Sequence, residues 1–255
     1  SPALADWSKL DEYFARCPDP RRPGRFAAAD EKLMTADERY KLGVFWLSFF
    51  ERLHMIRGMD RLFLDFYEEP DGLQQLMGVV KEYLLTTVDE FASRGMDGMI
   101  LGEDWGMQDR LMISPEMWRE WFKPHYADII EEIHGRGMDA WLHSCGHIDP
   151  IIGDFVELGL DVLHPLQYGC VDWEKAAREY GGKVCFLGAV DVAGVMVNGT
   201  PSEVEAHVDE IVRELGRADG GLILAPANTI MPETPMENIR ALYERMERYR
   251  ALPYS

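Results

Sequence analysis

Six short apolar runs alternate with longer amphipathic segments, and this alternation constrains the fold of the chain more than any other feature. The runs cover residues 42–47, 97–102, 138–143, 160–165, 183–188 and 221–226. Each run is mostly apolar on both faces, which is typical of a parallel strand covered on both sides. The segments between the runs carry apolar residues at three- and four-residue spacing, which predicts helices.

Two Thr-Pro-x-Glu sequences, beginning at Thr200 and Thr234, mark helix starts. In this pattern the threonine caps the helix, the proline fills its first position, and the glutamate closes a capping box. The four helices expected most clearly cover residues 71–95, 114–137, 200–216 and 234–250. Pro124 is expected to break or kink the second of them.

Strands and helices that alternate through short loops form a parallel sheet with right-handed crossovers. No GxGxxG follows any of the runs, so a dinucleotide-binding sheet has no support. We expect an α/β fold, a (β/α)8 TIM barrel, as a single domain over residues 40–255 after an irregular segment over residues 1–39. Only six strand-helix units can be recognised, so two strands either lie within residues 1–39 or are missing from this chain. In the second case a partner copy, as in a homodimer, or a rearranged N-terminal segment must cover the open edge.

The composition narrows the class of protein. The 45 acidic and 26 basic residues give a net charge of -19, which argues against a nucleic-acid binder and is compatible with a basic partner surface. No apolar run approaches the roughly 20 residues of a membrane span, and the N-terminus does not resemble a signal peptide. The four cysteines form no CxxC pair, so we expect reduced thiols in a cytoplasmic protein.

Polar side chains follow the carboxyl ends of the predicted strands, where the chemistry of a β/α barrel takes place. The residues at these ends are Glu103, Asp104, His143, Ser144, Cys145, His164, Gln167, Asp191 and Asn228. The opposite strand ends repeat glycine and aspartate, which are turn residues. We therefore expect the polar set to converge on one functional mouth.

His143 and Cys145 form the most specific pair in this set. Two residues apart and just past a strand, they can point the same way, and imidazole with thiolate suits Zn²⁺. A catalytic zinc needs about three protein ligands and one open position. The pair alone is incomplete, and the alternative is a strand-end histidine hydrogen-bonded to a carbonyl beside a small buried cysteine.

The remaining polar residues each have two interpretations. Glu103 and Asp104 are candidates for a general base, a metal ligand or a substrate anchor, or else they form a helix cap or solvated turn. Trp105 either covers the mouth or wedges its loop. Gln167 and Asp191 either contact substrate or stabilise loops and turns.

Three blocks of sequence resemble a known superfamily. They cover residues 102–130, residues 142–167, and the pair of segments 187–216 and 221–246. In order and spacing they resemble the uroporphyrinogen decarboxylase superfamily. That superfamily holds the decarboxylases of haem synthesis and the corrinoid-protein methyltransferases of methylotrophic anaerobes. The resemblance implies a (β/α)8 barrel.

The His-x-Cys-Gly of "HSCG" resembles the methyltransferase branch, in which it provides two of three zinc ligands. The resemblance therefore implies zinc held by His143 and Cys145. The methyltransferases place the third ligand, a cysteine, in a "PGC" turn after the last strand, but here that turn ends in Asn228. The residues that could substitute near the same mouth are His164, Cys170 and Glu103.

The decarboxylase branch is the alternative. Its members use no metal and bind a tetrapyrrole through an arginine-rich "RQAGR" segment, whereas residues 20–26 here read "PRRPGRF". The histidine of their "GHG" turn is again replaced by Asn228. A third alternative is a non-catalytic barrel that binds a corrinoid, a porphyrin-like ligand or a partner protein.

We predict a zinc-assisted methyltransferase that acts with a corrinoid carried by a partner protein. Its small-molecule methyl donor or acceptor would be a methoxy, methylthiol or methylamine-type compound. The residues assigned to this reaction are His143 and Cys145 for the metal, Glu103 and Asp104 for catalysis, and Trp105, Gln167, Asn228 and Asp191 for substrate contact.

Overall fold

A computed structural model describes residues 2–35, 38–68 and 70–250. It contains the six expected strands, each within two residues of its predicted ends. They are β1 (Leu42–Trp46), β2 (Gly98–Glu103), β3 (Asp139–Ser144), β4 (Val162–His164), β5 (Cys185–Val190) and β6 (Leu222–Pro226). The prediction of an α/β chain with six parallel strands is therefore confirmed.

The chain divides into two compact units. One comprises Ser1–Asp104 with Trp121–Ala140, and the other comprises Trp105–Glu120 with Trp141–Ser255. In the first unit β1 and β2 pair in parallel. In the second unit β3, β4, β5 and β6 pair in parallel in that order, and the β3–β4 register sets His143 opposite His164.

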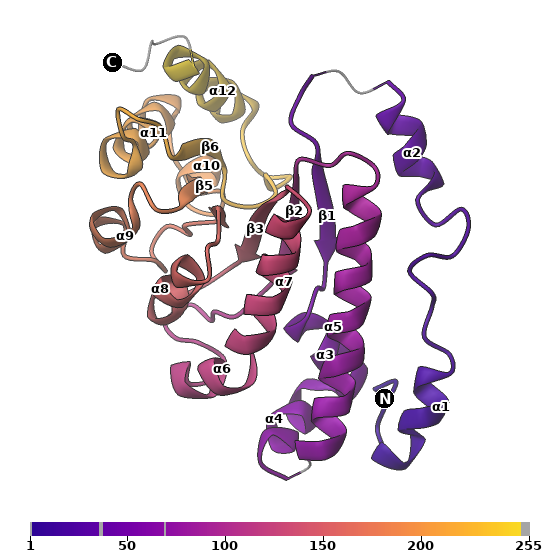
Figure 1. Ribbon diagram of the computed structural model, residues 1–255. Helices are drawn as coiled ribbons and strands as arrows, with labels where there is room; N and C mark the ends of the chain where they lie inside the picture. The colour runs from indigo at the N-terminus through magenta and orange to yellow at the C-terminus, as the bar shows by residue number, and fades with distance from the viewer. Residues whose placement is uncertain (1, 36–37, 69, 251–255) are drawn as a thin grey trace. The chain divides into compact units, whose positions relative to one another are not determined.

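The first unit has the helices α3 (Phe50–Arg57), α4 (Met59–Glu68), α5 (Pro70–Ala92) and α7 (Lys123–Gly135). Of these, α5 and α7 lie beside the β1–β2 pair (Figure 1). The N-terminal segment, expected to be irregular, carries three short helical stretches joined by loops: η1 (Trp7–Lys9), α1 (Leu10–Phe14) and α2 (Ala27–Leu33). The described residues up to position 39 contain no strand.

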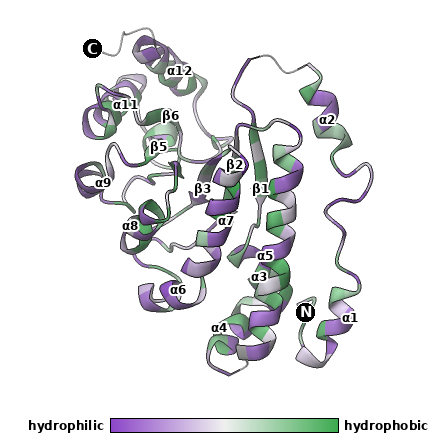
Figure 2. Cartoon of the chain, in the orientation of Figure 1, coloured by the Kyte–Doolittle hydropathy of each residue, from purple (hydrophilic) through white to green (hydrophobic). Residues whose placement is uncertain are grey.

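The second unit has the remaining helices. They are α6 (Pro115–Trp121), α8 (Asp149–Glu157), α9 (Trp173–Tyr180), α10 (Val195–Asn198), α11 (Pro201–Leu215) and α12 (Met236–Arg250). In both units the helices alternate between hydrophobic and hydrophilic residues along their length, as expected for helices that bury one side (Figure 2). No helix among the described residues is long and apolar enough to cross a membrane.

The helix-start signals give different outcomes. At α11 the capping box forms: the Glu203 N–H donates to the Thr200 hydroxyl, and the Thr200 N–H donates to the Glu203 carboxylate at 2.7 Å. At α12 the predicted threonine cap is wrong, because the Thr234 hydroxyl is buried without a hydrogen-bond partner in the described chain. The helix begins instead at Met236.

The helix predicted over residues 114–137 is interrupted, as expected. It forms α6 and α7, which are separated by Phe122. Pro124 lies in the first turn of α7, where its missing N–H leaves no backbone hydrogen bond unmade, whereas within a continuous helix it would clash with the preceding turn.

Aromatic side chains fill the core of each unit. In the first, Phe49 and Phe122 are fully buried with ring centroids 5.9 Å apart. In the second, Trp118 lies between Trp105 and Phe155, at centroid distances of 6.1 and 4.9 Å. These edge-to-face pairs fix the loop that follows β2 within the second unit.

Candidate metal centre

His143 and Cys145 lie together at the carboxyl end of β3. The Nε2 atom of His143 is 3.4 Å from the Sγ atom of Cys145, and both side chains are partly exposed. A tetrahedral zinc, with Zn–N of about 2.0 Å and Zn–S of about 2.3 Å, sets its two ligand atoms about 3.5 Å apart. The pair is therefore spaced as two ligands of one zinc ion, so the residues present fit the metal that the sequence predicts.

His164 orients the imidazole of His143. The Nδ1 atoms of the two rings are 2.7 Å apart, as their opposite positions on β3 and β4 require. Burial, and then the neighbouring His143, lower the pKa of His164 to about 4, while a hydrogen bond to the backbone carbonyl of Pro226 acts in the opposite direction. His164 is thus neutral near pH 7 and has one N–H to donate.

One pair of tautomers satisfies both contacts. If the His164 Nε2–H donates to the Pro226 carbonyl, its Nδ1 must accept the Nδ1–H of His143. His143 then directs an unprotonated Nε2 toward Cys145, which is the form that a metal ligand requires. The sequence offered His164 as a third ligand, but the structure places it behind His143.

Asn228 lies beside Cys145. Its Nδ2 atom is 3.5 Å from the Cys145 sulfur, and its side chain is exposed in the turn after β6. The structure therefore sets Asn228 next to Cys145, and its predicted contact with substrate stays a prediction. The Asn228 amide donates a hydrogen bond to the Cys145 sulfur. Because an amide is a poor zinc ligand, a third ligand for a metal held by His143 and Cys145 would have to come from another residue.

Gly146 and Gln167 fix the turn that follows Cys145. Gly146 has a φ of +81°, and a Cβ atom there would collide with the backbone of Gly106, so only glycine fits. The Gly146 N–H donates to Gln167 Oε1 at 2.8 Å. Gln167 thus stabilises the loop, which was the second of its two interpretations, and its side chain is only partly buried.

Glu103 is the last residue of β2, and its side chain caps the start of α3. Its side chain is 1% exposed, and its two oxygens accept the N–H groups of Phe49 at 2.5 Å and Glu51 at 3.0 Å. Burial raises the pKa of Glu103 to about 8, and the two N–H donors act against that rise. This is the geometry of a helix cap, with no oxygen left over for a metal or a substrate.

Asp104 is the last residue of the first unit and is only partly buried. The next residue, Trp105, donates its backbone N–H to the Ser144 hydroxyl at 3.0 Å. Sequence reasoning assigned no role to Ser144, although a hydroxyl between His143 and Cys145 is a signal that could have suggested one. Ser144 is fully buried and fixes the backbone directly after Asp104.

The side chains of Trp105 and Asp191, which were predicted to contact substrate, contact other parts of the chain instead. Trp105 is fully buried against Trp118, so it wedges its loop. The Asp191 carboxylate accepts the N–H groups of Ala193 and Gly194 at 3.1 and 3.0 Å and caps the start of α10. Both side chains shape loops at strand ends.

Cys170, another suggested third ligand, is buried, and its thiol contacts Gln108 Oε1 at 3.4 Å. Burial raises the pKa of this thiol, which disfavours the thiolate that a metal ligand must supply. The Nδ1 atom of His147 lies 2.8 Å from the Cys170 carbonyl. All four cysteines are free thiols, as expected.

The sequence model of the uroporphyrinogen decarboxylase (URO-D) family matches residues 24–249. The chain belongs to this family. The predicted resemblance is thereby confirmed at the level of the family.

Relatives with assigned names fall into two groups. The chain is 20% identical to the methylcobamide:CoM methyltransferase MtaA of Methanosarcina barkeri, over 72% of this chain and 51% of the relative. It is 28% identical to the methylated-thiol–coenzyme M methyltransferase of Methanosarcina mazei, over 51% and 32%. It is also 23% identical to the uroporphyrinogen decarboxylase of Coxiella burnetii, over 72% and 49%. The chain spans about half the length of the relatives it matches, and a third of the second.

A solved structure supports the fold. A methyltransferase from Methanosarcina mazei superimposes with a TM-score of 0.72 at 19% identity, over 89% of this chain and 66% of that one. At this identity the likeness shows the fold alone, which is an α/β fold with six parallel strands of the URO-D barrel type.

Proposed function

We propose that this chain carries the metal centre of a zinc-assisted methyltransferase. The enzyme would move a methyl group between a small methylated compound and a corrinoid carried by a partner protein. The observation that carries the proposal is the 3.4 Å spacing of His143 Nε2 and Cys145 Sγ, with His164 behind the imidazole. The named methyltransferases among the relatives support the choice of branch.

The proposed ligands are His143 and Cys145, together with Asp104, for which the sequence predicts a catalytic or metal-ligating role. Asp104 replaces the family cysteine in this scheme, because Asn228 lacks a ligand of sufficient strength and both oxygens of Glu103 are occupied by backbone donors. A nitrogen, a sulfur and an oxygen ligand suit zinc and leave a fourth position open.

When bound, zinc would act as a Lewis acid that activates the sulfur or oxygen centre of the methyl donor or acceptor. The residues of the chain prepare the site for that chemistry. His164 holds His143 in its ligating tautomer, and the Asn228 amide donates to the Cys145 sulfur. We propose that Asn228 and Gln167 also contact substrate, since their side chains remain accessible and each has an amide.

Metal-free tetrapyrrole decarboxylation is the second candidate. It is kept because uroporphyrinogen decarboxylases match the chain as well as the methyltransferases do, at 23% identity. The third candidate, a barrel that binds a corrinoid or partner without catalysis, predicts neither bound zinc nor turnover.

Metal analysis and activity together discriminate among these candidates. Protein prepared under reducing, chelator-free conditions should hold about one zinc per chain. It should also transfer a methyl group from free methylcobalamin to coenzyme M. The variants His143→Ala and Cys145→Ser should lose both properties, and His147→Gln is the matched control that keeps them. Absence of zinc together with turnover of uroporphyrinogen in the presence of EDTA would favour the decarboxylase.

The adjacent carboxylates provide a test of the ligand assignment. Asp104→Ala should lose zinc while it keeps its stability. Glu103→Ala should keep zinc but lose about 2–4 kcal/mol of stability, because the N–H groups of Phe49 and Glu51 lose their acceptors and a cavity forms. If Glu103→Ala lost zinc and Asp104→Ala kept it, Glu103 and not Asp104 would be the ligand.

A further inference from the structure

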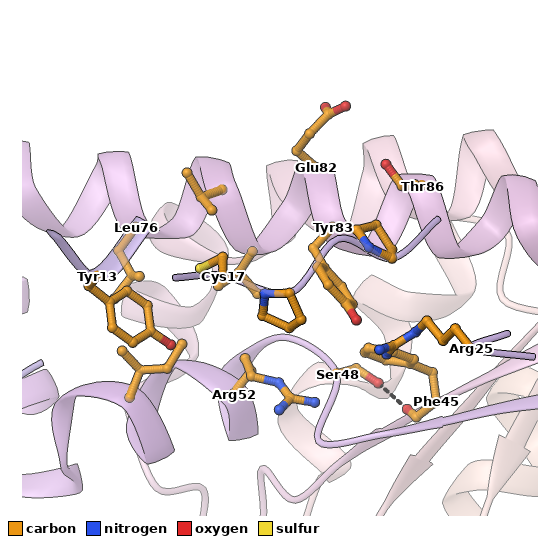
Figure 3. A pocket seen from close by; sticks show the side chains of 15 residues that line it. Tyr13, Cys17, Arg25, Phe45, Ser48, Arg52, Leu76, Glu82, Tyr83 and Thr86 are labelled. Carbon is orange, nitrogen blue, oxygen red and sulfur yellow. Dashed lines mark hydrogen bonds between the residues drawn. The ribbon is translucent and has the colours of Figure 1, made fainter. Parts of the chain in front are cut away.

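A cavity of about 400 Å³ lies entirely within the first unit (Figure 3). Four parts of the chain form it: α1 with the loop that follows it, the end of β1 with the residues just after it, α3 and α5. None of the residues assigned to the metal centre lines it. Its floor is apolar, since Ile56, Leu76 and Val80 are buried there.

Two arginines face the interior of this cavity. The guanidinium of Arg25 lies 5.5 Å from the ring centroid of Tyr83, and that of Arg52 lies 5.8 Å from the ring centroid of Phe45. The Arg52 Nε–H also donates to the Leu47 carbonyl at 3.1 Å, which holds the side chain in place. Figure 3 shows both arginines directed toward Tyr83 and Phe45.

Neither arginine has an ion-pair partner among the described residues, which is unexpected in a chain with 45 acidic residues and 26 basic ones. Arg57, by contrast, pairs with Asp65 at 2.6 Å. Glu82 also lines the cavity, but its side chain points away from the interior in Figure 3. The cavity therefore presents two arginines without ion-pair partners among the described residues beside aromatic rings, and the charge of Asp19 also reaches Tyr83.

The other polar groups of the cavity are hydrogen-bond donors near neutral pH. Burial raises the pKa of Tyr13 and of Tyr83, while the positive charge of Arg52 acts against the rise in both, so both hydroxyls stay protonated. Partial burial also raises the pKa of Cys17, so this thiol is a poor nucleophile although it can be reached from solvent. The cavity therefore offers hydrogen-bond donors and positive charge but no strong nucleophile, which suits reversible binding of a ligand better than a covalent reaction with it.

We propose that this cavity binds a small carboxylate that has an aromatic or similarly flat apolar body. The carboxylate would lie between Arg25 and Arg52, where planar guanidinium groups match its two oxygens. The body would pack on Phe45 and Tyr83 above the aliphatic floor. A volume of about 400 Å³ lies in the range of small-molecule sites.

Calorimetric titration with 2-naphthoate and 2-naphthamide measures how much the negative charge of the ligand contributes to its affinity, because the two molecules have nearly the same shape. The carboxylate should bind about tenfold to hundredfold more tightly than the amide. Inorganic phosphate, which has charge without an apolar body, should bind more weakly than 2-naphthoate. Equal binding of acid and amide, or of phosphate and acid, would overturn the proposal.

Variants place the ligand in this cavity. Arg25→Gln and Arg52→Gln should each weaken 2-naphthoate binding about tenfold or more and leave 2-naphthamide unchanged. Arg22→Gln, an exposed neighbour of Arg25 that does not line the cavity, is the matched control. If Arg52→Gln fails to fold, Arg52→Lys replaces it in the test. This variant keeps the positive charge and should retain part of the affinity for 2-naphthoate. Unchanged binding in folded Arg25→Gln and Arg52→Gln would refute the site.

Cysteine alkylation gives a second readout. Cys17 lines the cavity and is exposed, so 2-naphthoate should slow its reaction with iodoacetamide and leave the rate of Cys185 unchanged. Zinc content should be the same in all the arginine variants. Failure of this proposal is therefore distinguishable from failure of the proposed metal centre.

Discussion

The contact between two imidazoles bears on which nitrogen of His143 carries a proton. The Nδ1 atoms of His143 and His164 are 2.7 Å apart, and His164 also hydrogen-bonds to the Pro226 carbonyl. Outer partners of this kind typically change metal affinity by about 10- to 100-fold. The consequences for zinc can be tested one residue at a time.

His164→Phe keeps a ring of similar size but removes the acceptor for His143. The expected result is a loss of zinc affinity of about 10- to 100-fold with the fold intact, measured by competition with a fluorescent chelator. His147→Gln is the control, because His147 contacts the Cys170 carbonyl and has no part in the His143 chain. Unchanged affinity in folded His164→Phe would show that the imidazole pair does not position the ligand.

Asn228→Cys should strengthen zinc binding. The Asn228 amide nitrogen is already 3.5 Å from the Cys145 sulfur, so a thiolate there can join His143 and Cys145 around one ion. The same chelator competition should show a gain of about tenfold or more. Asn228→Ser, which is equally small and lacks the thiol, should show no gain. A gain in both variants would mean that loss of the asparagine, and not the new ligand, is responsible.

At the scale of elements, α11 and α12 are joined by a partly buried charge network. The Asp209 carboxylate accepts two hydrogen bonds from Arg245, both at 2.6 Å, and a third from the Tyr249 hydroxyl at 2.7 Å. Arg245 is the main reason why the pKa of Asp209 is lowered from its ordinary value of 3.8. A folded pKa below the unfolded one means that the stabilisation is complete above pH 3.8 and is lost as the pH falls through the folded value.

Asp209→Asn should therefore cost about 1 kcal/mol at pH 7, a value kept low because both charged partners are partly exposed to solvent. Urea unfolding should show the difference from the parent protein shrinking as the pH is lowered from 7 toward 3. Glu205→Gln on the same helix should have little effect at either pH. A cost that is independent of pH would mean that packing, and not charge, joins the two helices.

Elements were predictable where the signal is local. The six strands follow from short apolar runs, and the Thr200 cap follows from four consecutive residues. The same four-residue pattern failed at Thr234, because tertiary packing buries that hydroxyl and the helix starts later. Local periodicity contains no information about how the chain packs around a helix end.

The candidate site was predictable only in part, for the same reason. His143 and Cys145 are two residues apart, so their proximity is local. The contact of His143 with His164 depends on the register of β3 against β4, and the cap formed by Glu103 depends on where α3 begins. The cavity between Arg25 and Tyr83 joins segments that no motif connects. Such contacts are set by the fold and not by neighbouring residues.

At the scale of the whole molecule, both units expose apolar residues on a strand. Val44 and Trp46 of β1 are 47% and 53% exposed, and Ile223 of β6 is 41% exposed. Exposed strands of this kind attract a covering segment or a second copy. The sequence-based expectation of such a cover, by a homodimer or by an N-terminal segment, stays a prediction.

Zinc should stabilise the folded protein as a whole. An ion that binds only the native state at 100 times its dissociation constant adds about 2.7 kcal/mol. For a chain of 255 residues this corresponds to a rise in melting temperature of about 5–10 °C. Differential scanning calorimetry of metal-free protein, with and without added zinc, measures the shift.

The net charge of -19 makes the controls for this experiment decisive, because exposed carboxylates bind divalent ions weakly at many places. Magnesium at the same concentration should shift the melting temperature little, since it prefers oxygen ligands and cannot use Cys145. His143→Ala and Cys145→Ser should each remove most of the zinc shift, and His147→Gln should keep it. An equal shift in all of these variants would place the zinc on the acidic surface and would leave the His143–Cys145 pair as an ordinary hydrogen bond at the end of a strand.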